Sequence, residues 1–345
     1  MKTKKLLSLV FALAMVMSLA ACGTKEPTGP AAPTTDEPIV MVCAGTFNDD
    51  SFMGVYMREY FKPYVEEKSE GRIEVQCSFN SVLGSDRELI EAMQLNTVQA
   101  AISPVNVIAN FNMPKLNAIC MPYLFKDRQD AYEQLDGEFG DYMAQDLSTI
   151  GLRCLRWGES AIRNLSNNQR EILTPDDCKG LKFRVMEATI DMGIINALGG
   201  SPTPMAFNEL YTGLQQGTVD GQDNGLVMTY NMKFYEVQKY YTVTEQYFLA
   251  NGFIVSELFW QSLPDDLKQI VEDGANYAME KGRELVVEQE ETAVPIMEKA
   301  GMKITYLTDA QKAAFKEATQ PVWDDIETIV QDETAIKMAQ ELYAR

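Results

Sequence analysis

Residues 180–225 read GLKFRVMEATIDMGIINALGGSPTPMAFNELYTGLQQGTVDGQDNG, and this stretch decides the fold. A β-like run over 181–185 precedes a segment of helical composition that ends at a Gly-Gly break. A Pro-x-Pro turn, a second helix and a tight turn over 220–224 are expected to follow, because proline, glycine and asparagine mark turns. A strand followed by helices in this order is typical of an α/β protein.

The same alternation continues on both sides of this stretch. Apolar runs predict strands over 39–44, 73–79, 100–103, 152–157 and 253–255, and helical spacing predicts helices over 52–67 and 128–146. Capping boxes at residues 85–88 and 308–311 predict two further helix starts. The amphipathic stretch 267–299 predicts one helix long enough to brace two lobes. Strands alternating with helices indicate a mostly parallel sheet.

The N-terminus predicts an exported lipoprotein. Lys2, Lys4 and Lys5 form a positive region, and the apolar run 6–17 that follows is too short to span a bilayer. Residues 19–22, Leu-Ala-Ala-Cys, match the lipobox of bacterial lipoproteins, so we expect a signal peptide over 1–21 and a lipid on Cys22. An ordinary cleaved secretory signal is the alternative. Residues 22–38, rich in Pro, Thr, Ala and Gly, are expected to form a flexible tether. This places the folded part outside the bacterial cell membrane, anchored to its surface.

Composition removes several function classes. The chain has 30 Lys and Arg against 50 Asp and Glu, a formal net charge of −20, which disfavours nucleic acid as a partner. The absence of histidine excludes Ser-His-Asp and Cys-His catalysis and histidine-containing zinc sites, and we expect neither a metal nor a cofactor. No disulfide is predicted, although Cys43 and Cys77 lie in neighbouring strand-like runs that permit one.

Four further segments belong with residues 180–225: SDRELIEAMQL at 85–95, MPYLF at 121–125, AIRNLSN at 161–167 and EVQKY at 236–240. Together they resemble the DctP-type substrate-binding proteins of tripartite ATP-independent periplasmic (TRAP) transporters, over nearly the whole chain after the tether. Asn96 departs from the glycine usual in that family, and Gln246 and the loop 48–51 lack histidines that are common there.

The resemblance implies a two-lobed, periplasmic-binding-protein-like α/β fold, with mostly parallel sheets, a central cleft and a long brace helix. Lobe I is expected to comprise residues 39–160 and 251–290, and lobe II residues 161–250 and 291–345.

The resemblance also implies the ligand and the residues that hold it. Arg184 is the expected clamp for the carboxylate of a small organic acid, because a guanidinium matches a carboxylate in bidentate geometry. Arg163, with Glu159 or Glu171 as a local partner, is a second cationic contact. The other predicted ligand-binding residues are Asn224, Phe207, Trp157, Glu159 and Asn48. Sugar acids, dicarboxylates and keto acids all fit the arginine clamp. Glu159 and Asp49, acidic residues in segments expected to line the cleft, favour a hydroxylated sugar acid.

Three functions follow from these observations. The first is a monomeric carrier that delivers an organic acid to the integral-membrane subunits of a TRAP transporter. The second is a binding protein of an ATP-driven importer, and the 180–225 segment argues against it. The third is an enzyme, for instance a surface glycosidase with paired carboxylates, for which so acidic a chain offers no specific support.

Overall fold

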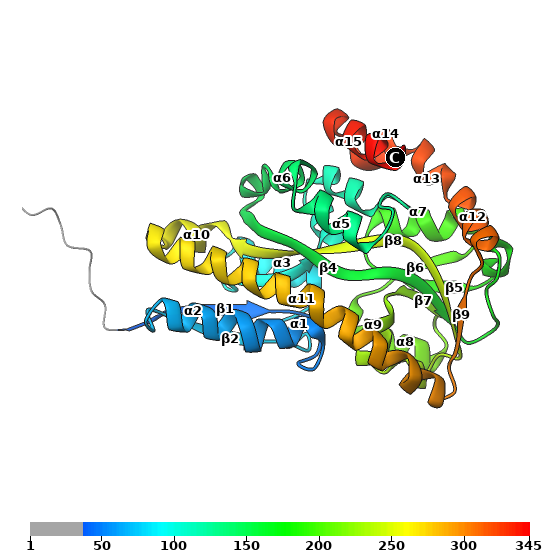
Figure 1. Cartoon of the computed structure of the whole chain (residues 1–345), viewed down its shortest axis with the longest axis horizontal. Helices are drawn as coiled ribbons and strands as arrows, with labels where there is room; N and C mark the ends of the chain where they lie inside the picture. Colours follow the sequence, from blue (N-terminus) through cyan, green and yellow to red (C-terminus); the bar gives the residue numbers. More distant parts are fainter. Residues whose placement is uncertain (1–36) are drawn as a thin grey trace, which may run out of the picture. The chain divides into compact units, whose positions relative to one another are not determined.

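The computed structural model describes residues 37–345; the predicted signal peptide and Cys22 lie outside this range. The described part contains a nine-stranded sheet with the order β2-β1-β3-β8-β4-β7-β5-β6, and β9 pairs with β8 (Figure 1). The strands are β1 Ile39–Ala44, β2 Ile73–Ser78, β3 Ala100–Pro104, β4 Leu152–Asn167, β5 Lys182–Val185, β6 Ser201–Pro204, β7 Gly221–Asn224, β8 Tyr240–Ser256 and β9 Lys303–Tyr306.

The sheet is parallel toward its two ends and antiparallel in the middle. Strand β1 pairs in parallel with β2 and β3, and β5 pairs in parallel with β6 and β7. The central pairs β3–β8, β8–β4 and β4–β7 are antiparallel. Alternate residues of β1, β3 and β8 pack into hydrophobic clusters on opposite faces, as helix-covered sheets require. The α/β expectation is confirmed.

Strands β4 and β8 run from one half of the sheet to the other, and we call them the crossing strands (Figure 1). They are 16 and 17 residues long, much longer than the segments 152–157 and 253–255 that the sequence predicts. One end of β8 pairs with β3 and the other with β9, while β4 pairs with β7 only over residues 164–167. The predicted lobe boundaries at residues 161 and 251 therefore fall inside continuous strands.

Helices surround the sheet, and both predicted capping boxes are present, at α3 and α12. A π-helical turn, Tyr56–Phe61, joins α1 to α2. The helices are α1 Phe52–Val55, α2 Lys62–Lys68, α3 Asp86–Gln94, α4 Val105–Ala109, α5 Arg128–Leu135, α6 Glu138–Ala144, α7 Thr189–Ala197, α8 Leu210–Gln216, α9 Leu226–Asn231, α10 Glu257–Ser262, α11 Asp265–Lys299, α12 Asp309–Ala318, α13 Gln320–Asp324, α14 Ile326–Val330 and α15 Glu333–Tyr343.

Helix α11 is the predicted brace. It is continuous over 35 residues, roughly 50 Å at the usual rise, and Figure 1 shows it running diagonally from α10 past α1 toward α9, alongside β4. Its close approach to the π-helical turn depends on Gly282, because a Cβ there would lie 2.8 Å from Tyr56 Cδ1. The helix contacts α1 and α2, which belong with β1 and β2, and also α9 and β9, so it joins both halves of the sheet.

Two expectations for residues 180–225 are wrong. The Pro-x-Pro segment is the edge strand β6, where proline is tolerated because one side of the strand makes no ladder hydrogen bonds. Residues 221–224 are the buried strand β7 rather than part of a tight turn. Gly221 permits the close pairing of β7 with β4, since a Cβ there would lie 2.1 Å from the carbonyl oxygen of Ser166.

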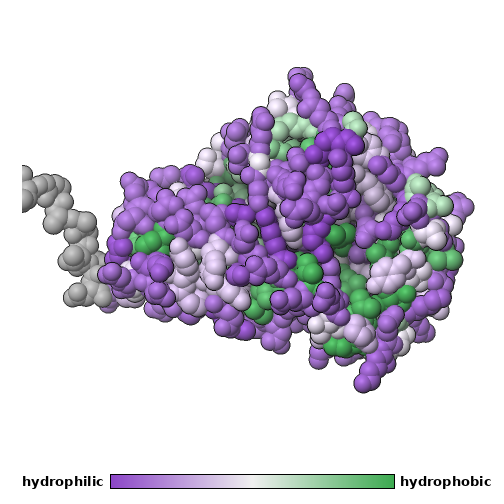
Figure 2. Space-filling model, viewed as in Figure 1, coloured by the Kyte–Doolittle hydropathy of each residue, from purple (hydrophilic) through white to green (hydrophobic). Residues whose placement is uncertain are grey.

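The described residues contain neither a disulfide nor a helix suited to span a membrane. Cys43 and Cys77 are directly paired in the β1–β2 ladder, yet both are free thiols. No helix within residues 37–345 is both long and apolar enough to cross a membrane. The face shown in Figure 2 is mainly hydrophilic, and its apolar residues form separate patches.

Candidate functional site

A cavity of about 40 Å³ lies where the carboxyl ends of parallel strands converge. Arg184 lies near the end of β5, Asn224 ends β7, Pro104 ends β3, and Thr46 and Phe47 follow β1. Ligands of open α/β sheets bind at this end of the strands. The volume accommodates only a few water molecules, because side chains from both halves of the sheet meet around it.

Arg184 is buried in the wall of this cavity with only 2% of its surface exposed. Its Nε donates to the carbonyl oxygen of Met205 at 2.9 Å, and its guanidinium carbon lies 5.7 Å from the centroid of the Phe207 ring. Burial and the nearby charge of Arg163 lower the pKa of Arg184 to about 10. Within residues 37–345 no carboxylate forms an ion pair with it. A buried cation without a counter-ion is costly, and an anionic ligand would supply one.

Arg163 differs from Arg184 because it already has a counter-ion. Its Nε donates to Asp223 Oδ1 at 2.5 Å, and its Nη1 donates to Asn224 Oδ1 at 2.9 Å. Burial opposes the charged form, yet the attraction of Asp223 prevails and raises the pKa of Arg163. Its partner is thus Asp223, and not Glu159 or Glu171 as the sequence suggests.

Asp86 faces Arg184 from the other half of the sheet. It occupies the first turn of α3, directly after the capping residue Ser85, and its Oδ1 accepts a hydrogen bond from Thr46 Oγ1 at 3.0 Å. Burial raises its pKa to about 6, against the opposing effects of the Thr46 hydrogen bond and the charge of Arg184. Asp86 therefore offers an acceptor close to the unpaired guanidinium.

The remaining wall is mainly apolar, with Ser160 and one unsatisfied amide as its polar groups. Phe207, Met186, Met228 and Leu249 line the cavity, so the predicted apolar contact Phe207 is at the site. Asn251 also lines it, and its buried Oδ1 has no hydrogen-bond partner among the described residues. This oxygen can accept a hydrogen bond from a ligand.

The structure places three predicted ligand residues away from the cavity. Trp157 is buried and donates its Nε1 proton to the carbonyl of Gly140 at 2.9 Å. The carboxylate of Glu159 is held by Arg128 Nε at 2.9 Å and by the hydroxyl of Tyr132. The amide of Asn48 donates to the carbonyl of Asn231 at 2.8 Å, so it joins the first loop to α9.

Sequence reasoning missed Asp86, Asp223 and Asn251. Asp86 stands inside the segment 85–95 that carries the family resemblance, but there it reads as an ordinary helix-start acid. Asp223 lies opposite Leu165 of β4 and contacts Arg163, whereas Asn251 lies opposite Gly158 and lines the same cavity as Arg163. They follow Arg163 by 60 and 88 residues in the sequence. Asp223 likewise stands inside the segment 180–225, so only Asn251 lies outside the segments that carry the resemblance.

Comparison with known proteins identifies the family. The family model of bacterial extracellular solute-binding proteins, family 7 (DctP), matches residues 44–328. The chain belongs to this family. It is 30% identical over 310 residues to the C4-dicarboxylate-binding periplasmic protein DctP of Rhodobacter capsulatus, an alignment that covers 89% of this chain and 92% of that protein.

Solved structures agree with this DctP-family assignment. The sugar acid binding protein DctPAm of Advenella mimigardefordensis, in complex with galactonate, matches with a TM-score of 0.85 and 26% identity, over 89% of this chain and 98% of that one. A TRAP periplasmic solute-binding protein of Chromohalobacter salexigens with bound D-glucuronate matches with a TM-score of 0.82 and 30% identity, over 88% and 99%. These matches confirm the two-lobed periplasmic-binding-protein fold and the TRAP solute-binding family.

Proposed function

We propose that this DctP-family protein captures a small organic acid outside the cytoplasmic membrane and delivers it to the membrane subunits of a TRAP transporter. The observation that carries the proposal is Arg184, whose buried guanidinium lies in the wall of a cavity and has no counter-ion within residues 37–345. The Advenella and Chromohalobacter proteins with bound galactonate and D-glucuronate, and the Rhodobacter dicarboxylate-binding protein, support a carboxylate as the anion. Because the cavity is small, the two walls must separate to admit such a ligand.

We further propose that the ligand carries hydroxyl groups and a single carboxylate. Asp86 and Asn251 Oδ1 are acceptors, and hydroxyl protons satisfy acceptors. An ionised Asp86 repels the second carboxylate of a dicarboxylate ligand. Asp86 and Asn251 thus support a sugar acid as the ligand. The residues that the sequence suggested for its hydroxyl groups are engaged elsewhere, because Glu159 pairs with Arg128 and the exposed Asp49 contacts Arg58 and Asn80.

Replacing Asp86 with asparagine is expected to shift selectivity from galactonate toward succinate. Asp86→Asn (D86N) loses a charged hydrogen-bond acceptor, so galactonate affinity should fall roughly tenfold to a hundredfold, whereas succinate affinity should rise. In the parent protein succinate should also bind more tightly as the pH falls from about 7.5 to 5.5, because Asp86 gains a proton near its raised pKa of about 6. Calorimetric titration of both acids at both pH values measures these effects.

The D86N variant also serves as the pH control. Succinate itself titrates in both experiments, whereas residue 86 titrates only in the parent protein. Equal pH dependence of succinate binding in parent and variant would argue against a role for Asp86. Unchanged galactonate affinity in D86N would contradict the hydroxyl-acceptor assignment while leaving the carboxylate clamp intact.

We propose that the protein acts as a monomeric lipoprotein without catalytic activity. Membership of a solute-binding family supports transport over the hydrolase alternative, and the TRAP relatives support a TRAP partner over an ATP-driven importer. The lipobox at residues 19–22 supports anchoring through Cys22.

Replacing Cys22 with alanine is expected to abolish lipid attachment. The Cys22→Ala variant lacks the thiol that receives the lipid, so the protein should leave the membrane fraction or retain its signal peptide. Cell fractionation and the intact mass of the chain measure both outcomes. Cys43→Ala, which removes a buried thiol from β1, is the matched control and should stay in the membrane fraction. Membrane retention with an unchanged mass in Cys22→Ala would contradict the lipoprotein assignment.

A further inference from the structure

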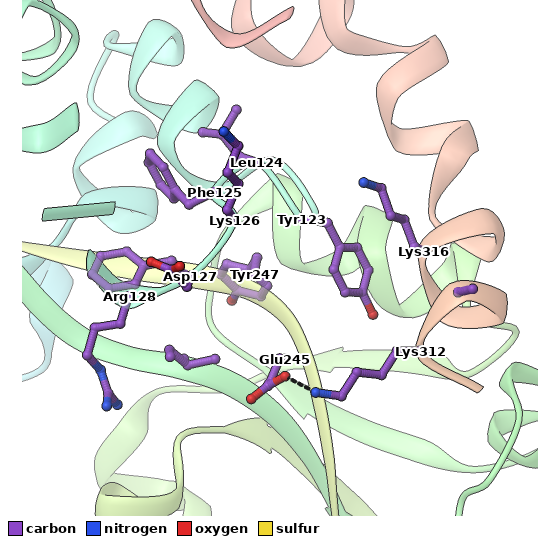
Figure 3. Close-up of a pocket in the computed structure, with 13 residues that line it drawn as sticks. Tyr123, Leu124, Phe125, Lys126, Asp127, Arg128, Glu245, Tyr247, Lys312 and Lys316 are labelled. Carbon is purple, nitrogen blue, oxygen red and sulfur yellow. Dashed lines mark hydrogen bonds and ion pairs between the residues drawn. The ribbon is translucent and has the colours of Figure 1, made fainter. Parts of the chain in front are cut away.

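A second, larger cavity lies on the opposite face of the crossing strands. Its volume is about 370 Å³, within the range of small-molecule sites, and neither Arg163 nor Arg184 lines it. Ile162 of β4 lines this cavity, whereas the next residue, Arg163, lines the first. Because successive strand residues point to opposite faces, the two cavities are separated by the thickness of the sheet. The second cavity is bounded by the loop that precedes α5, by β8 and by α12 (Figure 3).

The walls of this cavity combine aromatic rings with an excess of positive charge. Tyr123, Phe125, Tyr247 and Phe248 supply the rings. Four cations and two acids line the cavity, although the whole chain is strongly acidic; they are Lys126, Arg128, Lys312, Lys316, Asp127 and Glu245. Arg128 is neutralised by Glu159 and Glu290.

The two lysines of α12 differ in how far they are engaged. Lys312 forms an ion pair with Glu245, and Lys316 lies 4.5 Å from the centroid of the Tyr343 ring. Within residues 37–345, Lys316 has no carboxylate partner. Figure 3 shows Lys312 extending from α12 toward Glu245, and Lys316 on the other side of Tyr123. A ligand that suits these walls has an apolar, flat body and a negative group at one end.

Two of the ten non-glycine residues with positive φ in the described chain lie in these walls. Tyr123 and Glu245 adopt left-handed conformations, with φ of 52° and 50°, which are unfavourable for bulky residues. Two hydrogen bonds join the segments that contain Tyr123 and Glu245. Tyr123 N donates to the carbonyl of Gln246 at 3.0 Å, and the Tyr123 hydroxyl donates to the carbonyl of Thr244 at 3.1 Å. Such strain persists only where surrounding contacts maintain it, and it is common at functional sites.

Hydrogen bonds lead from this strained segment to the first cavity. The β4–β8 register shifts between Arg163 and Leu165, opposite the segment that contains Glu245. The side chain of the next residue, Gln246, donates from Nε2 to Asp223 Oδ2 at 3.0 Å, and Asp223 is the counter-ion of Arg163. The side chains of Gln246 and Asp223 thus connect the residue after Glu245 to Arg163.

We propose that the 370 Å³ cavity is a second binding site, for an aromatic carboxylate that places its ring against Tyr123, Phe125 and Phe248 and its negative group on Lys312 and Lys316. The carboxylate of the bound aromatic acid competes with Glu245 for Lys312 and so loosens the segment around Glu245. Binding at the second cavity therefore weakens ligand binding at the first cavity. The site itself is independent of the proposed function; only this coupling rests on it.

Binding of 2-naphthoate to the purified protein tests the site. Calorimetry is expected to detect binding of 2-naphthoate that exceeds that of the neutral 2-naphthamide, with Lys316→Gln weakening it about threefold to fivefold. Ala313→Trp places a large side chain at the exposed mouth of the cavity and should abolish binding. Ala310→Trp, on the same helix but outside the cavity, is the matched control and should bind as the parent does. Loss of binding in Arg184→Ala with retention in Ala313→Trp would show that the probe occupies the first cavity, and would overturn the proposal. Absence of any 2-naphthoate binding would overturn it as well.

The coupling is tested by titrating galactonate with and without saturating 2-naphthoate. We expect the galactonate affinity to fall about fivefold or more, and the 2-naphthoate affinity to fall by the same factor at saturating galactonate, as linkage requires. The effect should vanish in Ala313→Trp and persist in Ala310→Trp. An unchanged galactonate affinity in the parent would overturn the coupling. Failure of galactonate to bind at all would instead count against the proposed function, because the 2-naphthoate titration is read independently.

Discussion

Replacing Arg184 with alanine is expected to reduce the affinity for galactonate by about a hundredfold to several-thousandfold. The ligand carboxylate would remain desolvated in the cleft without its counter-ion, and truncating one partner of a buried charge pair costs about 3–5 kcal/mol. Arg184→Lys should recover only part of this loss, because an ammonium group cannot form the bidentate contact of a guanidinium. Calorimetric titration of galactonate against both variants measures the effect.

Controls separate this effect from misfolding and from a change of net charge. Arg184 has no counter-ion in the described residues, so R184A should melt at or above the temperature of the parent; the variant no longer buries an unpaired charge. Arg72→Ala removes the same charge from an exposed pair with Asp266 and should bind galactonate normally. If R184A folds and binds galactonate within a few-fold of the parent, the assigned carboxylate clamp is wrong.

Replacing Asp223 with alanine is expected to lower the free energy of unfolding by about 3–5 kcal/mol. Asp223 is buried and accepts hydrogen bonds from Arg163 Nε and Gln246 Nε2, so its loss leaves Arg163 as a second unpaired guanidinium beside Arg184. Asp223→Asn retains an acceptor oxygen and should cost less. Urea unfolding of the parent and both variants gives the difference.

An exposed ion pair provides the comparison for Asp223. Glu171 pairs with Lys303, whose side chain is 59% exposed, and Glu171→Ala should change stability by no more than about 1 kcal/mol. Equal destabilisation by Asp223→Ala and Glu171→Ala would contradict the view that the buried pair stabilises this part of the fold. Because Arg163 forms the buried pair with Asp223, Arg163→Ala should affect folding as well as binding, unlike R184A.

Elements whose signals are local were predicted well from the sequence. The capping boxes at Ser85 and Thr308, the strand β1 and the long helix α11 each depend on neighbouring residues, and the structure confirms them. Strands β6 and β7 were missed because proline, glycine, aspartate and asparagine favour turns when taken alone. Pairing with β5 and β4, which the local sequence does not encode, overrides that preference.

The candidate site was predictable where the family resemblance reached it. Arg184, Arg163, Asn224 and Phe207 meet at one cavity, although their ligand contacts stay a prediction. Glu159 lies four residues before Arg163, and simple alternation along β4 would place both on one face. The register shift between Glu159 and Ala161 breaks that alternation, so Glu159 turns toward Arg128 instead. A bulge of this kind leaves no mark that the sequence alone reveals.

The two crossing strands restrict how this protein can move. Lobes joined by loose loops can swing and rotate in many directions, whereas β4 and β8 form a hydrogen-bonded ribbon with little slack. Relative motion of the lobes is then confined to bending and twisting of that ribbon, with its bulges as the compliant points. Little freedom of relative lobe motion is then lost when the cavity walls close on a ligand. The entropic cost of capture is then low, so a larger share of the attraction that we propose between Arg184 and a ligand carboxylate is available as affinity.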